Sequence, residues 1–231
     1  MNEKTEKLNG KGAILTMSIL AIICLIVGLL FMAIPYFTNG NNMHEAIQTW
    51  TNAYIYYLAA ILLVMLPYYL KDLKKRGGGF ELLKQEIIDK DKLWGDILFG
   101  VLSGVISVII CLVIAKIEMS YLPNKGNTNV SDHTPIIIKL LVLCIIAPIV
   151  KEIVFRLYSK LFLEDKYGIF PAVLISSIIF GVFDWHNGGL SFVAGIIWYL
   201  FYIKRRRLIV PMVGHCMINL IPIILNLFIA S

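Results

Sequence analysis

Lys151-Glu152-Ile153-Val154-Phe155-Arg156 decides how this chain folds, because it places three ionisable side chains inside an apolar segment of membrane-spanning length. The apolar segment runs from Pro135 to about Phe162. Charges are costly in hydrocarbon, so ionisable residues in such segments usually face the protein interior. Glu152 and Arg156 are four residues apart, so a helix places them on one face, where we expect them to pair. Lys151 lies about 100° further around the helix.

The composition indicates a protein with several membrane-spanning helices. The chain has 231 residues, 58% of them hydrophobic, and its mean hydropathy of +0.79 is far above that of a soluble globular domain. The net charge of +6 does not predict nucleic-acid binding, because the basic residues cluster in loops between apolar segments. The four cysteines lie in separate apolar segments, so we expect neither disulfides nor a Cys-x-x-Cys metal site.

The predicted fold class is all-α: a polytopic membrane helix bundle of about seven transmembrane helices, plus one cytoplasmic amphipathic helix. Most of the apolar segments can cross ~30 Å of hydrocarbon at ~1.5 Å per residue. They are residues 13–37, 50–70, 95–118, 135–162, 168–186, 190–203 and 208–230. Gly100-x-x-x-Gly104 favours a close helix contact within the chain over a dimer contact.

The amphipathic stretch lies in loop 71–94, where apolar residues recur at helical spacing after Gly77-Gly78-Gly79. The sequence is equally consistent with two positions for this amphipathic stretch: on the inner membrane surface, or packed on the helix bundle.

The loops between the apolar segments predict the orientation. The N-terminus, loop 71–94, loop 163–167 and the tetrad Lys204-Arg205-Arg206-Arg207 are basic. The intervening loops carry a single lysine between them. Basic loops stay in the cytoplasm, so we expect the N-terminus inside the cell and the C-terminus outside, in the plasma membrane of a bacterium.

Two further polar spots lie in apolar segments. The sixth segment is short, which places the preceding turn, with Asp184 and His186, below the membrane surface, where protein or water must surround it. His215 and Asn219 share one face of the last segment. Together with His186 they are candidate metal ligands, or they simply hydrogen-bond to neighbouring helices. Polar groups brought inward from three helices predict a functional site in the bundle core.

These residues resemble the CAAX prenyl endopeptidase and bacteriocin-processing family of intramembrane proteases (CPBP, also called Abi). That family carries Glu-Glu-x-x-x-Arg, Phe-x-x-x-His and His-x-x-x-Asn or Asp on separate transmembrane helices. Here Glu152 and Arg156 match the first motif, Phe180 matches the second, and His215 and Asn219 match the third. The resemblance implies an N-terminal part, residues 1–134, followed by a CPBP-like core, residues 135–231.

Two family positions are substituted, and both belong to the water-activating groups. The leading Glu is Lys151 and the middle His is Asp184. In the family these groups activate the attacking water, with or without a divalent metal such as zinc, while the last His and Asn polarise the scissile carbonyl. A charged lysine cannot accept a proton from water. We therefore predict that Lys151 and Asp184 form an ion pair in place of that water. Alternatively, Glu152 or His186 substitutes for the missing base or imidazole.

Three functions follow. The first is a catalytically impaired family member that binds a membrane peptide or protein partner, as in bacteriocin self-immunity or envelope scaffolding. The second is an active metallo- or glutamate endopeptidase for membrane-presented peptides. The third is a small transporter or channel component. The sequence shows no inverted-repeat signal of the kind found in many transporters, which counts against this function.

Overall fold

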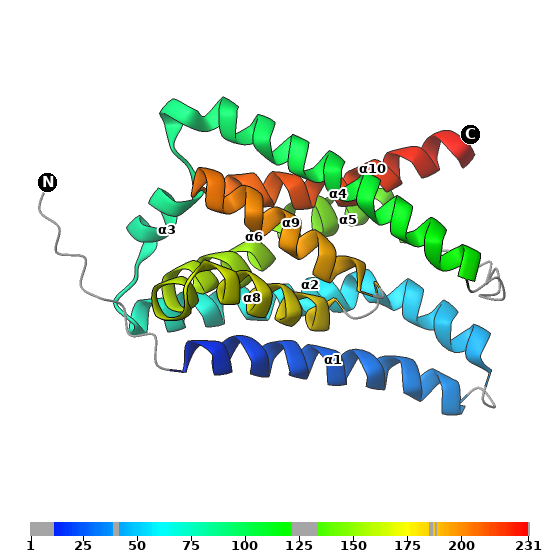
Figure 1. Ribbon diagram of the computed structural model, residues 1–231. Coiled ribbons are helices and arrows are strands. Elements are labelled where there is room, and N and C mark those ends of the chain that lie inside the picture. The colour runs from blue at the N-terminus through cyan, green and yellow to red at the C-terminus, as the bar shows by residue number, and fades with distance from the viewer. Residues whose placement is uncertain (1–11, 39–41, 122–133, 185–186, 188, 231) are drawn as a thin grey trace, which may run out of the picture.

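A computed structural model describes residues 12–38, 42–121, 134–184, 187 and 189–230. The described residues form a bundle of helices, with α1 along one edge and α4 and α10 at the opposite edge (Figure 1). The N-terminal part contains α1 (Ala13–Thr38), α2 (Met43–Lys75), α3 (Phe80–Ile87), a 3₁₀ turn (Lys90–Lys92) and α4 (Leu93–Tyr121). The C-terminal helices are α8 (Ile169–Phe183), α9 (Leu190–Arg205) and α10 (Ile209–Ala230).

The predicted all-α membrane helix bundle is confirmed. Within the described residues, three stretches are helical, long and apolar enough to cross a membrane, namely Ala13–Leu30, Glu45–Lys75 and Phe80–Ile114. Ile169–Phe183 and Ile209–Leu225 are shorter apolar helices. The predicted segments correspond to helices, but several boundaries differ from those predicted. The second helix begins at Met43 rather than at residue 50 and runs on to Lys75, and α8 ends at Phe183 rather than at residue 186.

The early end of α8 has a local cause. Asp184 has left the helical region, with φ −101° and ψ 38°. The backbone N–H of Asn187 donates to the carbonyl of Asp184 at 3.0 Å, which closes a turn there. A sequence that continues with Asn-Gly-Gly favours such a turn over further helix.

One run of helix, residues 136–167, passes through the middle of the bundle and carries the charged motif. It consists of α5 (Ile136–Lys139), α6 (Ala147–Glu152) and α7 (Asp165–Tyr167), joined by the π-helical segments Leu140–Ile146, Ile153–Leu157 and Ser159–Glu164. Residues 150–159 are all buried. A helix that is apolar on every side can be buried in this way, and here it carries its charged side chains into the core.

The contact between α4 and α10 depends on two glycines. A Cβ added at Gly100 would lie 2.6 Å from Cβ of Val213, and one added at Gly104 would lie 2.5 Å from Cβ of Met217. Real side-chain atoms do not approach that closely, so only glycine lets the two helices come together here. The Gly-x-x-x-Gly pattern therefore makes a helix contact within the chain, as predicted.

The amphipathic stretch is α3, and it packs on the bundle. Leu83 is buried, and the carbonyl of Glu86 accepts the backbone N–H of Leu208 at 2.8 Å. The outer side of α3 leaves Phe80 76% exposed. Of the two predicted positions, packing on the bundle is present, and the exposed side is free to meet another surface.

Candidate functional site

The two substituted family positions form a buried ion pair between the middle helix and the end of α8. Nζ of Lys151 donates to Oδ1 of Asp184 at 2.5 Å, and the two side chains are 3% and 6% exposed. The predicted contact is therefore present. Because Asp184 ends α8, its side chain can turn back toward Lys151. The ammonium group also lies 5.0 Å from the ring centre of Phe183.

Glu152 joins the first and third motifs. Its Oε1 lies 2.9 Å from Nδ1 of His215 on α10. Its Oε2 lies 3.2 Å from Nε of Arg156, one helical turn further along. Glu152 and Arg156 are completely buried and His215 is 3% exposed. The pairing expected from the four-residue spacing is present, and the carboxylate also holds the imidazole of the last helix.

Aromatic rings surround this charged cluster. The ring of Trp198 stacks on His215 with centroids 4.5 Å apart and planes 20° apart. Phe180 meets the same imidazole edge-on at 5.8 Å. The guanidinium carbon of Arg156 lies 4.7 Å from the centre of the Phe180 ring. A cation over an aromatic face is stabilised by the ring quadrupole, more so when water is excluded.

Arg156 is held from α9 as well. Its Nη2 donates to the carbonyl of Gly195 at 3.1 Å. A Cβ at Gly195 would lie 3.3 Å from that same Nη2 and from the Phe180 ring. The glycine therefore provides both the acceptor and the room that the guanidinium needs.

Asn219 completes a helix hydrogen bond that Pro148 cannot make. Ala147 sits at the end of a π-helical turn, and its N–H bonds the carbonyl of Val142 instead of Leu143. The next donor in π-helical register would be residue 148, but proline has no N–H. The carbonyl of Leu143 is thus left for a side chain, and Nδ2 of Asn219 donates to it at 2.7 Å.

The described residues do not fit a divalent metal. They contain no group of three or more His, Cys, Asp and Glu side chains placed to hold an ion. Nδ1 of His215 contacts Glu152 and Nδ2 of Asn219 donates to Leu143, which leaves one ring nitrogen of His215 and the amide oxygen of Asn219 as the atoms that could reach an ion. The ammonium of Lys151 lies beside the one further carboxylate of the cluster, Asp184, where it would repel a cation. His186, the third predicted ligand and possible substitute imidazole, lies outside the described residues.

The structure therefore brings together five of the seven predicted site residues, which are Lys151, Glu152, Arg156, Asp184 and His215, whereas Asn219 hydrogen-bonds to the carbonyl of Leu143. Trp198, Gly195 and the carbonyl of Leu143 were not predicted. Trp198 and Gly195 lie in the short sixth segment, whose spacing gave no signal for contacts with the charged motif. The role of Leu143 depends on the π-helical register before Pro148.

Comparison with known proteins finds one family and one curated relative that match part of the chain. The family described as Rce1-like, type II CAAX prenyl endopeptidase Rce1-like, matches residues 133–221. A curated relative, "Putative membrane peptidase YdiL" of Bacillus subtilis (strain 168), is 34% identical over 90 residues. That match covers 38% of this chain and 37% of the relative. No solved structure matches the chain.

The matched segment carries all three motif positions on the middle helix, α8 and α10. Over this segment, the chain is similar to the CAAX prenyl endopeptidase-like (CPBP) family of membrane proteins.

Proposed function

We propose that this chain binds a membrane-associated peptide or protein and has lost most or all of the peptidase activity of its family. The observation that carries the proposal is the buried contact at 2.5 Å between Lys151 and Asp184. These are the two positions at which the family motifs have a Glu and a His. An ammonium group cannot accept a proton from water. When it is paired directly with a carboxylate, it also leaves no room for a water molecule between the two groups.

The remaining groups of the site do not supply a free base. Glu152 is shared between Arg156 and His215. Its two carboxylate oxygens lie 3.2 Å from the guanidinium and 2.9 Å from the imidazole, and the side chain is completely buried. The amide of Asn219 is turned to a helix carbonyl rather than to an open space for a substrate. The same contacts connect the middle helix to the end of α8 and to α10, so the family fold can persist without the reaction.

A binding role is consistent with a protein that keeps the motif-bearing helices of the family but has other residues, Lys151 and Asp184, at two positions that activate water in the family. Self-immunity to a bacteriocin and scaffolding of envelope or secretion proteins are the two roles we favour. We place the chain in the plasma membrane of a bacterium, with the N-terminus in the cytoplasm and the C-terminus outside. The distribution of basic loops supports that orientation, and the relative from Bacillus subtilis supports a bacterial membrane peptidase lineage.

One observation favours a second function, an active endopeptidase with reassigned residues. Glu152 and His215 retain a carboxylate and an imidazole in direct contact at 2.9 Å. Carboxylate–imidazole pairs serve as general bases in many hydrolases. In this function the pair would activate water on the other ring nitrogen of His215. The assay below separates the two functions.

The test is cleavage of quenched peptides by purified protein in liposomes, with a prenylated CAAX peptide and a mixed library of hydrophobic peptides as probes. We expect no cleavage by the unaltered chain. Lys151→Glu combined with Asp184→His restores both motif positions and should produce cleavage. Adding His215→Ala to that double variant should abolish the gain, which ties it to the site.

Cleavage by the unaltered chain would refute the proposal, and its loss in Glu152→Gln protein that thermal unfolding shows to be folded would establish the second function. A restored double variant that folds, measured by thermal unfolding, but cleaves neither probe would also count against it. In that case the two substitutions would not be what separates this chain from an active protease.

A further inference from the structure

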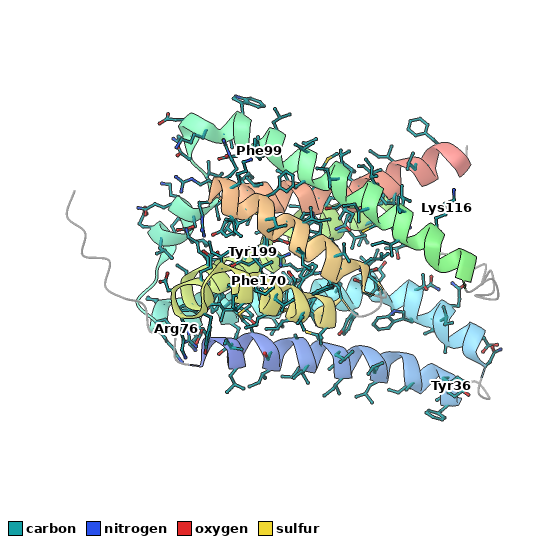
Figure 2. The ribbon with its side chains drawn as sticks, in the orientation of Figure 1. Tyr36, Arg76, Phe99, Lys116, Phe170 and Tyr199 are labelled. Atoms are coloured by element: carbon teal, nitrogen blue, oxygen red, sulfur yellow. The ribbon has the colours of Figure 1, made fainter. Side chains whose placement is uncertain are left out.

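Among the described residues, one end of the bundle carries most of the charged groups that lie outside the core. It comprises the end of α2, all of α3, the start of α4, α7 and the end of α9 (Figure 1). We name it the lysine end. Arg76 lies at this end and Lys116 at the opposite end (Figure 2). The charges at the lysine end divide into two groups with different partners.

The arginines of this end are paired within the protein. Nε of Arg76 lies 2.6 Å from Oδ2 of Asp72, and Nε of Arg205 lies 2.6 Å from Oδ1 of Asp96. Arg206 pairs with Glu164, and Arg207 pairs with Asp89 at 3.0 Å while donating to the carbonyl of Gln85 at 2.8 Å. Lys160 joins them by pairing with Glu86 at 2.5 Å. Apart from the local Arg76–Asp72 pair at the end of α2, these contacts connect the segments around α3 and α4 to the middle helix and to the end of α9, and the five pairs together neutralise five carboxylates.

The remaining lysines point outward. Those whose side chains are exposed are Lys71, Lys74, Lys75, Lys84, Lys90, Lys92, Lys166 and Lys204. The exposed carboxylates among the described residues of this end are fewer, namely Glu81, Asp91 and Asp165. Apart from an approach of Lys92 to Asp89 at 4.0 Å, no ion pair to these lysines is found in the part of the chain that the structure describes. The outer surface of the lysine end is therefore strongly positive.

Large apolar side chains are exposed on the same surface. Trp94 at the start of α4 is 82% exposed, Phe170 at the start of α8 is 77% exposed and Phe80 on α3 is 76% exposed. Phe80 and Lys84 are four residues apart, so they share the outer side of α3, whose inner side holds the buried Leu83. Aromatic rings beside lysines, at the end of a membrane bundle, lie where the acyl chains meet the headgroups.

We propose that the lysine end binds the phosphates of anionic phospholipids, with Phe80, Trp94 and Phe170 inserted at the headgroup level. A membrane suits the surface better than an acidic protein or a nucleic acid does. The positive surface is continuous with the apolar flanks of the bundle, where Leu98, one turn beyond Trp94, is 67% exposed. Exposed lysines attract anionic headgroups within a Debye length of the surface.

At the lysine end, the arginines are paired with carboxylates while most lysines are exposed, and this difference explains how the outer surface stays positive. Arginine makes fixed, directional contacts with carboxylates, whereas lysine is a mobile point charge. Each internal pair removes a carboxylate that would otherwise repel lipid phosphates. The inference holds whether or not the chain cleaves peptides, because it does not involve the site around Glu152.

The test uses the full chain in nanodiscs that contain phosphatidylcholine and phosphatidylglycerol in equal parts. Both leaflets of a nanodisc are the same, so the orientation of the protein does not matter. Native mass spectrometry of the released complexes counts the bound lipids of each kind. We expect phosphatidylglycerol to be enriched around the unaltered chain. Replacing Lys74, Lys75, Lys84 and Lys90 with Gln should lower that enrichment on the order of tenfold.

Three controls keep the test decisive. The same four positions changed to Arg should retain the enrichment, and Lys116→Gln, at the other end, should leave it unchanged. Thermal unfolding in pure phosphatidylcholine should be alike for all variants, which shows that they fold. The enrichment should also fall in high salt, because the contacts are electrostatic.

Two results would overturn the proposal. The first is an unaltered chain with no preference for phosphatidylglycerol. The second is a folded Gln variant that keeps the full enrichment.

Discussion

Replacing Asp184 with Asn tests whether the core of this site is a true buried ion pair. At 2.5 Å and an effective dielectric constant of ~20, the gross attraction between Lys151 and Asp184 is about 7 kcal/mol. Burying two ions costs several kcal/mol each, so the net contribution of the intact pair is small. Breaking the pair leaves a lysine at 2% exposure without its carboxylate. We expect a loss of about 3–5 kcal/mol.

Thermal unfolding in detergent measures this loss. For a chain of this size, about 1 kcal/mol lowers Tm by ~2–4 °C, so Asp184→Asn should lower it by about 6–20 °C. Asp165→Asn is the matched control, because Asp165 is exposed, and its effect should stay within ~0.5 kcal/mol. Lys151→Met together with Asp184→Leu removes both charges and should be close to neutral, or more stable.

The reasoning fails if Asp184→Asn unfolds at the temperature of the unaltered chain. It also fails if the apolar double variant is as unstable as the single one. Either result would mean that the two charged ends are not coupled in the folded protein.

Three further variants probe the neighbouring contacts. Asn219→Leu leaves the Leu143 carbonyl without its donor at 2.7 Å and should cost about 1–3 kcal/mol in chemical unfolding. Gly104→Val forces a Cβ to 2.5 Å from that of Met217 and should cost about 1–3 kcal/mol by the same measurement. Glu152→Gln removes the charge that compensates a fully buried guanidinium and should lower stability by about 3–5 kcal/mol, seen as a loss of folded protein in size-exclusion chromatography after heating.

Two of these variants have a matched control. Gly79→Ala adds a methyl group where nothing lies within 4 Å, so its stability should match that of the unaltered chain. Asn219→Gln keeps the amide and should retain more stability than Asn219→Leu. Unchanged stability in Gly104→Val would show that α4 and α10 do not pack as closely as described. A stable Glu152→Gln would show that Arg156 is solvated rather than buried.

Much of the site could be predicted from the sequence because its charged residues stand out within apolar segments. Lys151 and Asp184 stand at positions where a resemblance led us to expect a Glu and a His, and opposite charges substituted in two helices predict a contact. That contact is present. The spacing of Glu152 and Arg156 likewise predicts a pair on one helix face, and the pair is present.

The partners of these residues on other helices were harder to predict. To predict the contact between Glu152 and His215, one must know how the middle helix and α10 are rotated relative to each other. No local sequence pattern specifies that rotation. The stacking of Trp198 on His215 depends on how far α9 slides along α10. The same limit applies to the basic tetrad, which we interpreted as a topology signal. Its arginines are ion-paired within the protein, and its lysine is exposed.

By itself, the sequence determined that this protein is a membrane helix bundle with charges in its core. Hydrophobic length and the cost of a lone ion in hydrocarbon are local properties, and each acts on one segment at a time. Only the tertiary structure decided which carboxylate meets which cation, and that Asn219 completes the helix at Leu143. Those choices follow from helix rotation, from π-helical register at Pro148 and from the close approach at Gly104. They exist only once several helices pack together, because packing then fixes which side chains share a buried space.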